Sequence, residues 1–258
     1  MVPLAFMFSG AIAVLAHLLV YSPIIRRGGK RWFMMVASIG VAFIIRYSVY
    51  IMAGIEKILN VQATVNVSTI YQIGGIGLTN VWIWSVTLAA CLVISLQIIL
   101  SKTGVGTAMR AVAGNAELAR ARGINSDLIV LVTWFVAGGL AGTAGFVWAA
   151  SSSVTPEIGW LLLFRAYAAS ILGGMVSFYG TVAGGFILGI AENLGMDLLH
   201  ESLGVNVAFK PIISFAIMVA VLLIKPTGLS DLKAVKTTSF LRRFTRSSDQ
   251  REGKLRVP

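Results

Sequence analysis

Long apolar stretches recur along the chain and are separated by shorter polar segments. A bilayer core about 30 Å thick needs about 20 helical residues to cross it. The pattern therefore predicts transmembrane helices, in which the backbone polar groups find their partners within the helix itself. Seven candidate segments are expected at residues 3–24, 32–53, 81–101, 127–150, 161–177, 179–199 and 209–225.

The fifth and sixth segments are joined only by the residues around Ser177 and Phe178. They form either two full crossings or a re-entrant pair that enters and leaves from one side. The predicted fold class is all-α, a polytopic transmembrane helix bundle of about seven apolar segments. We expect one transmembrane domain over residues 1–229, followed by a basic tail over 230–258 that is disordered or lies on the inner leaflet.

The composition agrees with a membrane protein and argues against a soluble one. The chain is 57% hydrophobic, only 12% charged, and has a mean hydropathy of +0.86, whereas soluble domains carry about 25% charged residues. Its single cysteine, Cys91, cannot form an internal disulfide. The two histidines lie far apart in the sequence, and we expect no metal site.

The net charge of +11 would suggest nucleic-acid binding in a soluble protein, but the positions of the charges suggest otherwise. Most basic residues fall in a first loop at 21–31, in a third loop at 101–126 and in the tail. The positive-inside rule places these three segments in the cytoplasm, with the carboxyl terminus inside. We therefore expect the membrane lipid, and no nucleic acid, as the partner of the basic residues.

Ionisable groups within the apolar segments are costly and point to packing or function. The candidates are Arg46, Arg165, Glu192 and Asp197. A pair between Arg165 and Glu192 would offset both desolvation penalties, whereas Asp197 lies near a segment end and is expected to reach the interface.

Glycines and alanines spaced four apart either allow close helix packing or line a cavity in the membrane. The sequence leaves both roles open for these positions. The pairs are Gly138 with Gly142, Ala141 with Gly145, Gly180 with Gly184, and Gly185 with Gly189.

The third loop is rich in alanine and predicts a short helix that ends at Gly123. Small apolar residues recur on one face of this helix, between polar flanks. Such a stripe suits docking into a groove of a partner protein, and it equally suits a linker on the membrane surface. The stripe consists of Met109, Val112, Ala113, Ala116 and Ala119.

Catalytic motifs are absent from the sequence. The serines at 151–153 lack a G-x-S-x-G context, and neither a P-loop nor a dinucleotide-binding fingerprint occurs. We therefore expect that the chain is not an enzyme and does not itself hydrolyse ATP.

Several ordered motifs resemble those of the permeases of branched-chain amino acid ABC importers, the Liv-type family. The third loop is similar to the coupling loop of that family, with its "G-x-A-x-R-A" and "A-x-x-x-G-I-N" motifs. Segments similar to "A-A-x-L-G-G", "G-A-x-x-G-G-x-x-L-G-x-x-E" and "P-T-G-L" follow in order. The matching residues are 106–111, 119–125, 168–174, 180–192 and 226–229, with 21–23 similar to a Y-R-P segment.

The resemblance covers about residues 15–230 and implies a permease subunit in the plasma membrane of a prokaryote. It implies as partners a second permease, separate ATPase subunits that use ATP and Mg, and an extracytoplasmic substrate-binding protein; the chain itself would need no cofactor. Family members usually carry more membrane sequence before residues 21–23, so the chain is expected to be short at its amino terminus. Ser22 stands where the family often has arginine.

The resemblance also implies roles for individual residues. The residues expected to couple transport to the ATPase are Gly106, Met109, Arg110, Ala113, Ala116, Glu117, Arg120 and Gly123. Those expected in the pathway or in helix packing are Arg165, Gly173, Gly174, Gly184, Gly185, Gly189 and Glu192. The alternatives are an ion-coupled carrier that uses Glu192 as a relay, an ABC permease for amides or urea, and, least favoured, a membrane-embedded enzyme.

Overall fold

The structure, a computed structural model, describes residues 1–56, 69–73, 76–175, 177–204, 206 and 209–224. The described chain is mainly helical and divides into two compact units, Met1–Pro156 and Glu157–Pro258. The predicted all-α membrane bundle is thereby confirmed. The basic tail lies outside the described residues, so the predicted boundary between domain and tail stays a prediction.

The first unit opens on a long helix that contains one widened turn. It consists of α1 (Val2–Ala16), the π-helical turn η1 (His17–Tyr21) and α2 (Ser22–Arg26). In η1 the amide of Ser22 donates to the carbonyl of His17, five residues back. Pro23 follows directly, and its missing N–H and bulky ring do not fit the regular hydrogen-bond ladder. The widened turn accommodates the proline without ending the helix.

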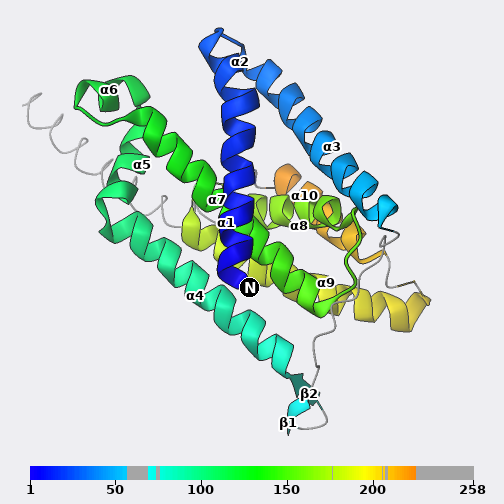
Figure 1. The fold of residues 1–258 in the computed structure, drawn as a ribbon. Helices are drawn as coiled ribbons and strands as arrows, with labels where there is room; N and C mark the ends of the chain where they lie inside the picture. Colours follow the sequence, from blue (N-terminus) through cyan, green and yellow to red (C-terminus); the bar gives the residue numbers. More distant parts are fainter. Residues whose placement is uncertain (57–68, 74–75, 176, 205, 207–208, 225–258) are drawn as a thin grey trace, which may run out of the picture. The chain divides into compact units, whose positions relative to one another are not determined.

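The remaining elements of the first unit follow in order along the chain (Figure 1). A short antiparallel hairpin lies in the loop between the second and third apolar segments. The sequence did not predict this hairpin. The elements are α3 (Arg31–Ile55), β1 (Thr69–Ile73), β2 (Ile76–Thr79), α4 (Asn80–Lys102), α5 (Gly104–Gly114), α6 (Ala116–Ala121) and α7 (Ser126–Ser151).

Helices α1 and α7 pack along each other in antiparallel directions (Figure 1). A Cβ atom on Gly138 would collide with Ala13, and one on Gly142 with Ser9. The predicted pair Gly138 and Gly142 therefore serves close packing. Towards the other end of the contact, His17 is buried against Trp134, with 5.3 Å between ring centroids.

The antiparallel contact places the end of α2 and the start of α7 at the same end of the first unit. The basic first loop follows α2, and the loop formed by α5 and α6 precedes α7. Both clusters of positive charge therefore lie on one side, as the positive-inside assignment requires.

The described part of the second unit consists of three helices, α8 (Ile158–Gly173), α9 (Phe178–Leu203) and α10 (Lys210–Ile224). Helices α8 and α9 meet backbone to backbone. A Cβ on Gly173 would fall on the carbonyl of Gly180, and one on Gly184 would fall on the carbonyl of Ala169. Gly174 turns the chain after α8 with φ of 86°, a conformation that favours glycine.

The close approach of α8 and α9 predicts a difference between two adjacent glycines of α9. We expect Gly184→Ala to lower the free energy of unfolding by about 1–3 kcal/mol, because the methyl group would push two backbones apart. At Gly185 an added Cβ meets no described atom within 4 Å. Gly185→Ala is therefore expected to leave stability unchanged or slightly raised. Thermal unfolding of the detergent-solubilised variants measures the difference, and equal midpoints would contradict this packing.

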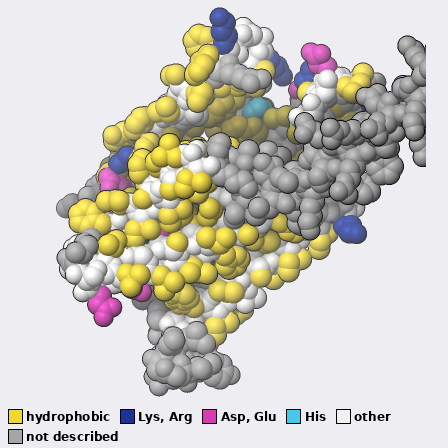
Figure 2. Space-filling model, turned by 180° about the vertical axis from the view of Figure 1, so that it is seen from behind, with side chains coloured by type: hydrophobic (Ala, Val, Ile, Leu, Met, Phe, Trp, Pro, Cys, Tyr) yellow, Lys and Arg dark blue, Asp and Glu magenta, His cyan; other side chains and the backbone are white. Residues whose placement is uncertain are grey.

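Among the residues that the structure describes, five helices are long and apolar enough to cross a membrane. The described parts of the fifth and seventh predicted segments, α8 and α10, are shorter apolar helices. The count of seven crossings and the re-entrant pair stay predictions. Much of the described surface is apolar, as the space-filling view shows for one face (Figure 2). The spanning helices are Val2–Arg26, Trp32–Ile55, Asn80–Lys102, Ser126–Ser151 and Phe178–Ser202.

Candidate functional site

The third loop folds as two short helices, each closed by its own cap. The side chain of Thr103 accepts a hydrogen bond from the amide of Gly106 and starts α5. Asn115 ends α5, and its Oδ1 accepts from the amides of Glu117 and Leu118, both at 3.0 Å, which starts α6. Gly123, with φ of 83°, follows the end of α6. A left-handed glycine at this position is a common helix stop, as the sequence predicted.

The break at Asn115 is the main difference from the single helix that the sequence predicted. Gly114 weakens the helix at this point, because glycine disfavours helix by about 1 kcal/mol relative to alanine. The side chain of Asn115 then offers the next amides an acceptor outside the helical ladder. Both effects depend on neighbouring residues alone, but the alanines on either side favour helix, and the sequence therefore predicted one continuous helix.

The predicted apolar stripe of this loop faces mainly inwards. Ala119 is buried, and Met109, Val112 and Ala116 are partly buried in the unit formed with α4 and α7. Ala113 is exposed. The outer surface also carries Leu118, which is 55% exposed.

Two of the three charged residues expected to contact the ATPase have partners within the chain. Arg110 donates to the carbonyl of Leu100, near the end of α4, and to the hydroxyl of Thr107 at 3.3 Å. Arg120 pairs with Asp127 at 2.8 Å. Both arginines thus tie the loop to the helices beside it, while Glu117 is exposed.

Gly106 and the hydroxyl of Ser126 tie the loop to its neighbours. Gly106 is buried where α5 turns back on α4, and a Cβ there would meet the carbonyls of Ile99 and Leu100. Ser126 is 2% exposed and donates to the carbonyl of Ala116 at 3.2 Å. The loop is therefore held at both ends, by α4 and by the start of α7.

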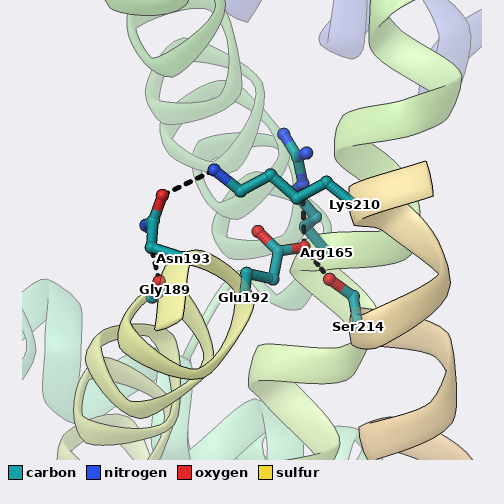
Figure 3. Close-up of polar contacts among 6 residues, drawn as sticks. All are labelled: Arg165, Gly189, Glu192, Asn193, Lys210 and Ser214. Atoms are coloured by element: carbon teal, nitrogen blue, oxygen red, sulfur yellow. Dashed lines mark hydrogen bonds and ion pairs between the residues drawn. The ribbon is translucent and has the colours of Figure 1, made fainter. Parts of the chain in front are cut away.

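A second polar cluster joins the three helices of the second unit (Figure 3). Arg165 of α8 donates through Nε to Oε1 of Glu192 in α9 at 3.1 Å. The hydroxyl of Ser214 in α10 donates to the same carboxylate oxygen. The side chains of Arg165 and Glu192 are 20% and 7% exposed, and Ser214 is completely buried. The predicted pairing of Arg165 with Glu192 is present in the structure.

A second set of polar contacts lies beside this cluster (Figure 3). The ammonium of Lys210, at the start of α10, donates to Oδ1 of Asn193 at 2.6 Å. Asn193 in turn donates through Nδ2 to the carbonyl of Gly189 at 2.7 Å. Asn193 is exposed on α9 and Lys210 is partly buried at the start of α10, and both lie next to the buried carboxylate of Glu192 (Figure 3).

Three of these polar residues were absent from the sequence-based site. Ser214 is a lone hydroxyl in an apolar run, and Asn193 directly follows Glu192. Lys210 marks the start of the last apolar segment. A polar residue inside an apolar segment is a signal that the sequence does contain, but its partner becomes known only when the helices are packed.

The other candidates have simpler surroundings. Arg46 is partly buried on α3, and its guanidinium carbon lies 5.9 Å from the ring centroids of both Tyr47 and Tyr50. Asp197 is exposed in α9, two turns before the helix ends. Within the described residues, no three His, Cys, Asp or Glu side chains gather as a metal ion would require.

Comparison with known proteins identifies the family. Residues 1–222 match the family described as "Branched-chain amino acid transport system / permease component". The "Probable branched-chain amino acid transport permease protein LivH" of Methanocaldococcus jannaschii is 30% identical over 234 residues, which are 88% of this chain and 73% of that protein. No solved structure gives a significant match.

Two bacterial relatives agree with this result. The high-affinity branched-chain amino acid transport system permease protein LivH of Escherichia coli K12 is 30% identical, over 86% of this chain and 72% of the relative. The corresponding protein BraD of Pseudomonas aeruginosa is 28% identical, over 81% of this chain and 66% of the relative. These relatives are transport subunits and not enzymes. The chain is therefore a multi-pass membrane protein that belongs to the permease family of branched-chain amino acid transport systems.

Proposed function

We propose that the chain forms, with a second permease subunit, the translocation pathway of an ABC importer for branched-chain or related neutral amino acids. Separate ATPase subunits would bind and hydrolyse ATP with Mg on the cytoplasmic side. A substrate-binding protein outside the membrane would deliver the amino acid. The relatives are permease proteins of branched-chain amino acid transport systems, which supports the substrate class.

The observation that carries this proposal is the capped loop of α5 and α6. It connects two helices that are long enough to span the membrane, α4 and α7, and it exposes Ala113 and Leu118 as well as the charged Glu117. The basic first loop lies at the same end of the unit, which supports a cytoplasmic position for both. An exposed leucine on a short, well-held helix fits into an apolar groove of a partner protein.

The contacts of Arg110 and Arg120 refine the proposed roles of the coupling residues. Both arginines would keep the loop in place by binding the end of α4 and the start of α7. The docking contacts would then come from Ala113, Glu117 and Leu118, which are exposed. Movement of a docked ATPase would pass through these fixed ends to α4 and α7.

Co-purification and transport assays test the proposal. We expect that the tagged chain, solubilised mildly from native membranes, retains an ABC ATPase and a second permease. Uptake of labelled leucine by cells should stop when ATP is depleted, even if the ion gradients are maintained. Uptake that follows the ion gradient in ATP-depleted cells would instead favour a carrier in which the buried Glu192 relays protons.

A further inference from the structure

Helix α9 presents four rows of side chains, each made of residues four apart, and these rows have different surroundings. One row, Gly184, Leu188, Glu192 and Met196, is buried against the other helices of the second unit. Another row is fully apolar and exposed to between 59% and 71%; it consists of Phe186, Ile190, Leu194 and Leu198. Large exposed apolar side chains of this kind suit contact with lipid.

The row between these two does not suit contact with lipid. It consists of Gly185, Gly189, Asn193 and Asp197, which we call the polar row. Gly189 is partly buried and the other three residues are exposed. A Cβ on Gly185 or Gly189 would meet no described atom within 4 Å. Asn193 has partners in Lys210 and Gly189, whereas the carboxylate of Asp197 would be costly if it faced lipid, so this end of the row suits contact with water or another polar partner.

Charges of both signs lie along the polar row. The ammonium of Lys210 lies over Asn193 at 2.6 Å (Figure 3). Asp197 follows Asn193 by one turn, about 6 Å further along the helix axis. A neutral amino acid carries one carboxylate and one ammonium, which are complementary to these two side chains. The two open glycines provide a flat wall beside them, where an apolar substrate side chain finds room.

We propose that the polar row of α9, together with Lys210, lines the water-filled pathway and contacts the charged groups of the transported amino acid. Lys210 binds the carboxylate of the substrate and Asp197 its ammonium group. Asn193 holds the ammonium of Lys210 in place over the row. The neighbouring pair of Arg165 and Glu192 fixes α9 to α8 and so sets the direction in which the polar row faces. This inference rests on the proposed function.

Single cysteines on adjacent residues of α9 test the inference. In a Cys91→Ser parent that lacks the native thiol, Gly189→Cys places a thiol in the polar row and Ile190→Cys places one in the apolar row. Both variants are assembled into the complete importer, and membrane fragments that expose both faces are treated with a charged methanethiosulfonate reagent that does not cross membranes. The reagent reacts with thiolates, which form in water and not in lipid.

We expect the reagent to modify Gly189→Cys at least about tenfold faster than Ile190→Cys, which corresponds to about 1.4 kcal/mol. Millimolar leucine should slow the modification of Gly189→Cys. Isopentylamine lacks the carboxylate and 4-methylpentanoate lacks the ammonium group, so neither should protect the thiol. Leucine uptake by cells of the Ile190→Cys variant should equal that of the parent.

Other outcomes would overturn the inference in distinguishable ways. Equal and slow modification of both thiols would place the polar row away from water. A disulfide between Gly189→Cys and a cysteine of another permease subunit would make the row a helix–helix contact. If leucine, isopentylamine and 4-methylpentanoate protect the thiol equally, Lys210 and Asp197 do not recognise the charged groups of the substrate. An importer with the unmodified chain that takes up no neutral amino acid would reject the proposed function itself.

Discussion

The Arg165→Met variant is expected to lose about 3–5 kcal/mol of folding stability, because it removes the charged partner of a buried carboxylate. Glu192 is 7% exposed at its side chain and sits within the apolar part of the second unit. In the variant, its described hydrogen-bond partner is the hydroxyl of Ser214. One hydroxyl cannot compensate for the desolvation of a full charge. The amount of folded protein in the membrane and its thermal midpoint in detergent measure the loss.

The double variant Arg165→Met with Glu192→Gln is the matched control. It removes both charges and keeps an oxygen that accepts from Ser214, so most of the lost stability should return. A double variant as unstable as Arg165→Met alone would contradict the explanation. The same double variant separates two roles of Glu192, because a proton relay cannot operate through glutamine. If ATP-driven uptake persists in this variant, the role of the Arg165–Glu192 pair is structural.

The helices and one ion pair were predictable from the sequence, because unpaired backbone groups and isolated charges both cost much free energy in a membrane. Long apolar stretches must bury their backbone polar groups as helices in a membrane, and α3 and α4 agree closely with the predicted segments 32–53 and 81–101. Arg165 and Glu192 were predicted to pair because an isolated charge at membrane depth is costly. The prediction for the fifth segment, 161–177, was less accurate. Helix α8 ends at Gly173, because Gly173 and Gly174 allow the chain to turn there.

The role of each glycine was not predictable from spacing alone. Gly180 and Gly184 have the same four-residue spacing as Gly185 and Gly189, yet the first pair packs against α8 and the second meets open space. Spacing shows that two residues share a helix face, but it does not show which neighbour covers that face. The partners of Arg110 and Arg120 were hidden for a similar reason, since they depend on how α5 and α6 fold back on α4 and α7.

Ala113→Asp is expected to reduce leucine uptake by more than about tenfold, because it would add a second carboxylate, besides that of Glu117, to the surface where the ATPase is proposed to dock. Removing a carboxylate from water without a partner costs several kcal/mol, and each 1.4 kcal/mol weakens binding about tenfold. Ala113 is exposed, so the new carboxylate stays in water while the permease is without its ATPase. Ala116 is partly buried, and aspartate there would combine a docking defect with a folding defect.

Ala113→Ser is the control for this prediction, because it adds a small hydroxyl at the same position without a charge. The two variants should reach the membrane in equal amounts and have similar thermal midpoints. Only Ala113→Asp should lose the co-purifying ATPase and the ATP-driven uptake. If Ala113→Asp retains both, the tip of the α5–α6 loop does not dock the ATPase. Loss of uptake with the ATPase still bound would show that Ala113 acts after docking, in passing the movement of the ATPase to α4 and α7.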